Sequence, residues 1–263
     1  MSASRYTLRP GFHFLLCAVA GCVITGCQTA RAPEASGPLP IPKTARIPKL
    51  TKPIQIDGRL DEAAWKEAVR LTPFVQHVTQ APARVKTEVR VGYDDFALYL
   101  GWTCEDPDIQ ATLKARDSKF WEEEVVEFFV TPGPLERYFE LQWNPLGGTF
   151  DAVITNQLGP DGQSKRYEGD WNFSAKEMTW AVAVDGTVQN SSDRDRRWTV
   201  EVRVPFSDLQ QQTPKPGALW RANFYRYNRD TGQEPELLSW SPIIWPGFHQ
   251  PTRFGYLEFV GSR

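Results

Sequence analysis

The chain has 263 residues and carries 30 basic and 32 acidic side chains, a formal net charge of −2 at pH 7. With no basic tract, this balance excludes nucleic acid as an expected partner. Aromatic residues make up 13% of the sequence and include 10 tryptophans. Tryptophan suits either a sandwich core or a stacking surface for a ligand, and the alternation within each segment must separate the two uses.

The N-terminal segment is typical of an exported protein. Two arginines precede an apolar stretch over residues 11–23, and the tetrapeptide ITGC at 24–27 closes it. The stretch is too short for a comfortable membrane span and has the layout of a secretory signal. The tetrapeptide resembles the bacterial lipobox, in which the cysteine receives a diacylglyceryl group. We therefore expect a signal peptide at 1–26 and a lipid anchor on Cys27.

The expected location is a membrane surface outside the cytoplasm. Gln28 is not the aspartate that some bacteria use for retention, so we expect the outer membrane, facing the periplasm or the cell surface. Residues 27–50 are rich in proline and predict an extended tether. We place the folded domain at 51–263. Its one cysteine, Cys104, falls on the buried side of a predicted strand and is interpreted as a core residue.

Beyond the tether the sequence predicts short strands separated by turns. Only residues 61–69, which are rich in alanine, favour a helix. There is no alternation of strands with helices and no internal repeat, so we predict an all-β fold, an antiparallel β-sandwich with one or two short helices. The segments with a period of two are 87–93, 96–104, 180–184, 198–206 and 254–260.

Two further predicted strands carry unusual outer faces. Glu127 lies between Val125 and Phe129 on one face of the strand at 125–130, whereas an ordinary solvent-exposed face would be polar throughout. In the strand at 138–144 the odd-numbered residues are apolar and predict the core face. The even-numbered residues form a polar row of Tyr138, Glu140, Gln142 and Asn144.

If these strands pair, Glu127 lies beside the polar row, and Trp121 comes shortly before it. Carboxylates and amides can bond sugar hydroxyls, while an aromatic ring stacks on the C–H face of a sugar. The pattern therefore favours a saccharide site. The alternative is that Glu127 and Glu140 simply face water.

Four ordered blocks of the sequence resemble the family 9 carbohydrate-binding modules. They are IDGRLDEAAW at 56–65, WEEEVVEFFV at 121–130, WTVEVRVPFSDL at 198–209 and the terminal segment at 240–259. The resemblance spans about residues 51–260. It implies a jelly-roll-like sandwich that grips an oligo- or polysaccharide between two tryptophans.

The resemblance also implies particular site residues. The first clamp tryptophan is Trp121, six positions before Glu127, as in the family. The second is Trp240 or Trp245, and the proline-flanked Trp245 is favoured. The family places polar contacts at Arg226 and Asn228, and His249 adjoins the Trp245 loop. The predicted ligand-binding residues are Trp121, Glu127, Tyr138, Asn144, Arg226, Asn228, Trp240, Trp245 and His249.

Catalysis and cofactors are not expected, although structural calcium stays open. Some family members bind calcium, and Asp106, Asp108 and Asp117 offer oxygen ligands, but Asp-Pro-Asp is also turn chemistry. The sequence has no catalytic triad, metal triad or phosphate loop. We predict a non-catalytic binding protein for carbohydrate catabolism. The alternatives are a hydrolase-associated module, a haem-binding sandwich using Met178 as axial ligand, and a protein-interaction scaffold.

Overall fold

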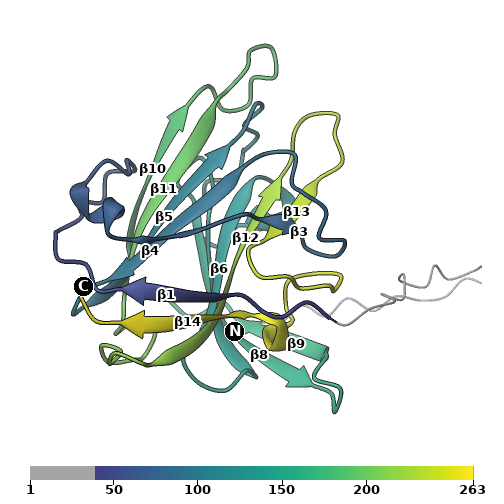
Figure 1. Cartoon of the computed structure of the whole chain (residues 1–263). Helices are drawn as coiled ribbons and strands as arrows, with labels where there is room; N and C mark the ends of the chain where they lie inside the picture. The colour runs from purple at the N-terminus through teal and green to yellow at the C-terminus, as the bar shows by residue number, and fades with distance from the viewer. Residues whose placement is uncertain (1–38, 263) are drawn as a thin grey trace, which may run out of the picture. The chain divides into compact units, whose positions relative to one another are not determined.

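The computed structural model describes residues 39–262, and they form two β-sheets packed face to face (Figure 1). The prediction of an all-β sandwich is confirmed. The nine-stranded sheet follows the order β1 (Thr44–Pro48), β14 (Gly255–Val260), β12 (Leu219–Asn228), β6 (Val125–Thr131), β7 (Arg137–Trp143), β8 (Thr149–Leu158) and β9 (Ser164–Asp170), with β13 (Glu236–Ser239) paired to β12 and β3 (Val75–Gln76) paired to β13.

The five-stranded sheet and three short 3-10 turns complete the fold. The sheet order is β10 (Thr179–Asp185), β11 (Arg197–Pro205), β5 (Ala97–Glu105), β4 (Thr87–Tyr93) and β2 (Val69–Leu71). The turns are η1 (Ala63–Lys66), η2 (Phe120–Glu122) and η3 (Pro251–Arg253). No helix in residues 39–262 has the length and apolar character needed to span a membrane.

The folded domain begins before the predicted start at residue 51. Strand β1 runs parallel to β14 and pairs with it (Figure 1). Its Ile47 side chain is fully buried. The expected tether is therefore wrong over residues 44–50, because the prolines around this strand hid its short apolar alternation. The predicted signal peptide, the lipidated Cys27 and the rest of the tether up to residue 38 lie outside the described residues.

The core between the sheets contains the residues that the period of two placed there. Val200, Val202 and Val204 of β11 face Phe128 and Leu141 of the larger sheet, and all five are fully buried. Such continuous apolar surfaces dominate the stability of a domain that has no disulfide.

Cys104 is buried in the same core, as predicted. Burial raises the pKa of its thiol to about 12, because the charged thiolate would lose its solvation. The residue is therefore a structural part of the core.

A loop covers part of the outer face of the smaller sheet, and it replaces the predicted helix at 61–69. Only η1 is helical, and Val69 already begins β2. The Glu201 carboxylate accepts hydrogen bonds from Trp65 Nε1 at 2.7 Å and from the backbone N–H groups of Asp57 and Gly58, both at 2.9 Å. Gly58 has φ +89°, and a Cβ there would lie 2.8 Å from the Val182 carbonyl carbon. Glu201 thus fastens this loop to the sheet.

Candidate functional site

A cavity of about 320 Å³ lies on the outer face of the larger sheet. Its floor comes from β6, β7 and β8, and its walls come from β9, β12, η2 and the loop at 247–249. The lining side chains are mostly aromatic, with a small polar group at the floor. They are Trp121, Glu127, Phe129, Glu140, Gln142, Phe150, Ile154, Tyr167, Trp171, Tyr227, Phe248 and His249, with Gly169 and Gly247.

Strand pairing brings the polar floor together. In the antiparallel register of β6 and β7, Glu127 lies opposite Gln142, and Phe129 lies opposite Glu140. Alternation then places Glu127, Glu140 and Gln142 on one face, since directly opposite residues share a side of the sheet. The predicted pairing of these strands, with Glu127 beside the polar row, is confirmed.

Two tryptophans form the aromatic end of the cavity. The rings of Trp121 and Trp171 lie 6.1 Å apart at 77°, and both pack on Phe150. Trp171 is 47% exposed. Gly169 permits this position, because a Cβ there would lie 2.8 Å from the Trp171 indole nitrogen. The two rings meet edge to face, so they build a corner and not a parallel clamp.

The two carboxylic acids at the floor lack compensating charge. Glu127 is only 2% exposed and makes no side-chain hydrogen bond within residues 39–262. Gln142 Nε2 donates to Glu140 at 2.6 Å, whereas the buried Gln142 Oε1 has no partner among the same residues. Burial raises the pKa of Glu140 to about 8. Burial, and then the charge of Glu140, raise the pKa of Glu127 well above its ordinary value.

His249 lines the cavity, and the Tyr138 side chain contacts it. The imidazole stacks on Tyr167 with ring centres 3.7 Å apart. Tyr138 is fully buried, and its hydroxyl shares a 2.7 Å hydrogen bond with His249 Nδ1. Burial lowers the pKa of His249 to about 3, so the ring is neutral at physiological pH. The assignment of Tyr138 to ligand contact is corrected to positioning His249.

Arg226 and Asn228 do not line the cavity, although both were predicted to do so. They share the inner face of β12 with Phe224 and are fully buried. Arg226 Nη2 bonds Asp106 at 2.9 Å and Asn228 Oδ1 at 2.5 Å. The neighbouring Tyr227 faces the cavity instead. Along β12, Phe224, Arg226 and Asn228 alternate with Tyr225 and Tyr227. Both groups mix aromatic and polar character, so the sequence did not reveal which of them faces the core.

Asn144 is also a structural residue. Its side-chain Nδ2 donates to the Leu113 carbonyl at 2.6 Å, and its Oδ1 accepts from the Gly148 N–H at 2.8 Å. These bonds close the turn after β7, which ends at residue 143, one position before Asn144. The polar row predicted from the sequence therefore reaches the cavity only through Glu140 and Gln142.

Neither proposed partner of Trp121 lines this cavity. Trp240 is 3% exposed and packs on Phe224 in the core between the sheets. Trp245 lines a neighbouring hollow of about 340 Å³, which shares Tyr167 and His249 with the cavity. The second tryptophan of the cavity is Trp171, which the sequence reading missed.

The missed aromatic residues have weak sequence signals. Tyr167 and Trp171 belong to, or directly follow, the edge strand β9, whose residues are largely exposed and show no apolar alternation. The one usable signal was Gly169 two positions before Trp171, since a glycine in a strand often marks the close approach of another group.

The residues suggested for calcium do not form one site. Asp106 lies with Glu124 and Asp230, and the Arg226 guanidinium lies 2.9 Å from Asp106 and 3.7 Å from Glu124. Asp117 lies elsewhere, 3.5 Å from Arg116. Asp108 and Asp117 therefore do not join Asp106 in one set of ligands. Met178, the suggested haem ligand, is buried in the core between the sheets and does not line the cavity.

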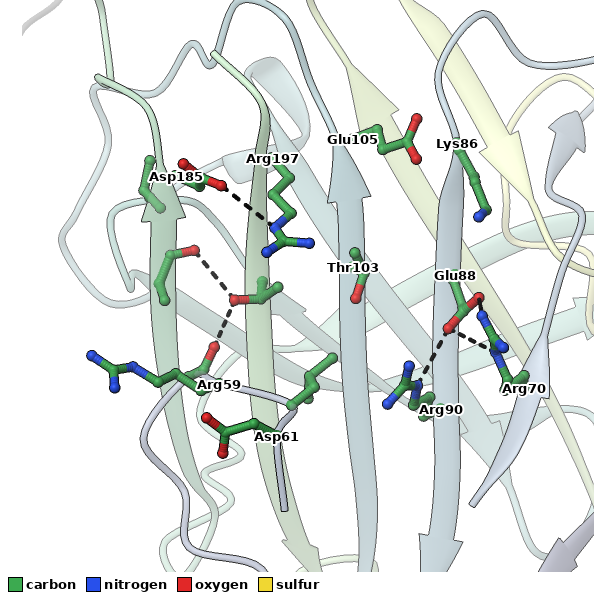
Figure 2. A pocket seen from close by; sticks show the side chains of 15 residues that line it. Arg59, Asp61, Arg70, Lys86, Glu88, Arg90, Thr103, Glu105, Asp185 and Arg197 are labelled. Carbon is green, nitrogen blue, oxygen red and sulfur yellow. Dashed lines mark hydrogen bonds and ion pairs between the residues drawn. The ribbon is translucent and has the colours of Figure 1, made fainter. Parts of the chain in front are cut away.

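A second cavity, of about 550 Å³, lies on the outer face of the smaller sheet. Figure 2 shows Thr103 at its centre and Glu88 paired with Arg70 and Arg90. At the other side Arg197 lies 3.7 Å from Asp185. No aromatic side chain lines this cavity, and many of its charges pair with one another. The aromatic cavity on the larger sheet is therefore the better candidate for a ligand site.

Comparisons with known proteins agree with this architecture. A candidate carbohydrate-binding protein from Bacteroides uniformis has a TM-score of 0.64 and 20% identity, over 83% of this chain and all of that protein. A family 9 carbohydrate-binding module from Caldicellulosiruptor kristjanssonii, solved with cellotriose, has a TM-score of 0.56 and 16% identity, over 84% of this chain and 95% of that one. The structure of a family 9 module from the same organism with glucose has a TM-score of 0.56 and 15% identity, over 84% of this chain and 97% of that one.

No curated protein matches the sequence significantly. The profile of carbohydrate-binding family 9 matches residues 58–259, which is nearly the whole described domain. The family resemblance of the four sequence blocks is thereby confirmed, and this chain belongs to carbohydrate-binding family 9.

Proposed function

We propose that the domain binds carbohydrate without transforming it, through the cavity between Trp121 and His249. The observation that carries this proposal is the polar floor of a cavity walled by tryptophans: the buried Gln142 Oε1 has no hydrogen-bond partner in residues 39–262, and the Glu127 carboxylate beside it has none there either. A buried acceptor without a partner is costly, and the hydroxyls of a sugar would satisfy it while the ring contacts the indoles.

The first ligands to consider are short glucose-based oligosaccharides. The related module from Caldicellulosiruptor kristjanssonii was solved with cellotriose and with glucose. The cavity, at about 320 Å³, has the size of a small-ligand site and accommodates one or two sugar units.

The arrangement of the carboxylates argues against hydrolysis. A glycosidase places its acid and its nucleophile or base on the two sides of the scissile bond. Glu127 and Glu140 instead project from adjacent strands on the same floor, so they would contact one side of a bound ring. An assay for released reducing ends should show no turnover of an oligosaccharide that the domain binds.

Calorimetry with a panel of neutral oligosaccharides tests the binding proposal. Trp121→Ala and Trp171→Ala should each weaken binding by about 30-fold, which corresponds to about 2 kcal/mol for a central aromatic contact. Trp245→Ala is the matched control, because this residue lines the neighbouring hollow and should leave affinity within about threefold. Equal losses for Trp171 and Trp245 would instead favour a clamp that spans both hollows.

We further propose that the domain is held at the outer membrane by a lipid on Cys27 and captures saccharides there for catabolism. The sequence at 24–27 supports this proposal. Cys27→Ser should move the protein from the membrane fraction to the soluble fraction. Unchanged membrane association would contradict the anchor and leave the binding proposal untouched.

A further inference from the structure

The lining of the cavity contains acidic side chains and no arginine or lysine that could act as their counter-charge. Two of its lining side chains, Glu127 and Glu140, are carboxylic acids, and none of its lining residues is lysine or arginine. The nearest basic group that lines it is His249, whose Nε2 lies 3.9 Å from Glu140 Oε2. Because burial lowers the pKa of His249 to about 3, the imidazole supplies no positive charge at neutral pH.

Within the described residues, only the two buried acids of this cavity lack both an arginine partner and a pair of N–H donors. Every other buried carboxylate in residues 39–262 has an arginine or at least two N–H donors within reach. Glu88, for example, pairs with Arg70 and Arg90 in the other cavity (Figure 2). The remaining examples are Asp106 and Glu124 with Arg226, Asp151 with Arg116, Glu236 with Arg84, and Asp195 and Glu201 with backbone or indole N–H groups.

The hydrogen-bonding capacity of the floor is also left open. Glu127 accepts no bond within the described domain, and Glu140 accepts one, from Gln142 Nε2. The Gln142 Oε1 atom is buried and unpaired among the same residues. When the two acids are ionised, all three open positions are acceptors, so the floor then calls for a ligand group rich in donors. An ammonium group has three N–H donors and no acceptor.

The aromatic walls of the cavity also favour a positively charged ligand group. Trp121, Trp171, Tyr167 and Tyr227 surround the floor with aromatic rings. The faces of such rings attract cations, and the attraction is stronger when the cation is desolvated. Carboxylates at the floor and aromatic rings at the sides together make a site that stabilises positive charge.

We propose that this cavity selects a sugar that carries a positively charged amino group, of the glucosamine type, over the corresponding neutral sugar. The ammonium lies between Glu127 and Glu140, and the rest of the ring contacts the indoles of Trp121 and Trp171. This inference rests on the proposed function, because it names the class of saccharide that the same site takes.

The electrostatics of the unliganded pair are consistent with that choice. Burial raises the pKa of Glu140 to about 8, so this acid stays mostly protonated at neutral pH while no cation is nearby, and burial also raises the pKa of Glu127. A bound ammonium would offset the repulsion between two carboxylates and release that proton. A neutral sugar supplies hydroxyl donors but leaves the two acids without a counter-charge.

Calorimetry on the full-length protein with an isosteric pair tests the inference. The probes are cellobiose and the fully deacetylated β-1,4 disaccharide of glucosamine, which replaces one hydroxyl of each unit by an ammonium. We expect the amino disaccharide to bind at least about 10-fold more tightly. Glu127→Gln and Glu140→Gln should each reduce this preference to about threefold or less. Glu105→Gln, on the exposed outer face of the other sheet, should leave it unchanged.

The outcomes separate the inference from the proposed function. Equal or tighter binding of cellobiose would overturn the selection of amino sugars while leaving carbohydrate binding intact. Absence of binding to both probes and to the whole neutral panel would contradict the proposed function itself. A preference for the amino sugar that persists in the Glu127→Gln, Glu140→Gln double variant would show that these carboxylates do not provide it. Thermal unfolding of each variant confirms that it is folded, and the glutamines should not weaken the fold because they match the acids in shape and carry no charge.

Discussion

Replacing Glu201 by alanine should destabilise the domain by about 4 kcal/mol. The Glu201 carboxylate is the common acceptor for the Trp65 indole and for the backbone N–H groups of Asp57 and Gly58, at 2.7 to 2.9 Å. Alanine would leave all three donors without a partner, and each unsatisfied buried donor costs about 1–3 kcal/mol. The loop can partly open in the variant and let water reach these donors, so the total loss of stability is smaller than the sum of the three costs.

The assay is urea-induced unfolding followed by tryptophan fluorescence, analysed by linear extrapolation. Thr199→Val, on strand β11, is a graded control for the same loop, since it removes the neutral hydrogen bond from Thr199 Oγ1 to the Gly58 carbonyl at 2.6 Å, together with a longer one to the Ala183 carbonyl at 3.4 Å. The shorter bond should contribute about 1 kcal/mol. A loss of less than 1 kcal/mol for Glu201→Ala would refute the role of this carboxylate as the fastener of the loop.

Three further predictions follow from the burial of single residues. Trp240→Ala should lower the free energy of unfolding, measured in urea, by about 3–5 kcal/mol, because it leaves a cavity between the sheets. A variant that keeps its stability but loses saccharide binding would instead show that Trp240 contacts the ligand. The Glu140 pKa is raised from 4.5 to about 8, so the unfolded chain loses this proton first and the melting temperature should fall as pH rises from about 4.5 to 8. Glu140→Gln should flatten that fall, and an identical pH profile would contradict the uncompensated burial of this acid. Cys104 should resist thiol reagents in the native protein and react fully in denaturant, and rapid labelling of the folded domain would contradict its place in the core.

The sequence determined which side chains share a face of a strand. The alternation along residues 198–204 correctly predicted the valines that fill the core, because side chains of a strand point to opposite faces in turn. The same rule placed Glu127 on the outer face of β6 and beside Gln142 once the strands paired. The four family blocks also identified the fold, since they lie in the core strands and in the loop that Glu201 holds.

The tertiary structure decided which face of each strand meets a ligand. Arg226 and Asn228 point into the core between the sheets. The sequence did not reveal this, because a second apolar cluster covers the outer face of the sheet, so that both faces of β12 are largely buried. With apolar cover on both sides, local alternation cannot distinguish the core from a covered outer face.

The cavity itself depends on contacts between residues far apart in the chain. Trp171 reaches Trp121 because β8 and β9 extend the sheet beyond β7, and His249 arrives from the loop before the last strand. The charge deficit is likewise a property of the assembled site. Glu127 and Glu140 are ordinary acids in the sequence, and only the folded structure buries them among aromatic side chains with no lysine or arginine in the lining of the cavity. Alternation is a local property and could be read from the sequence, whereas the pairing of distant strands and the solvation of a buried group depend on the whole fold.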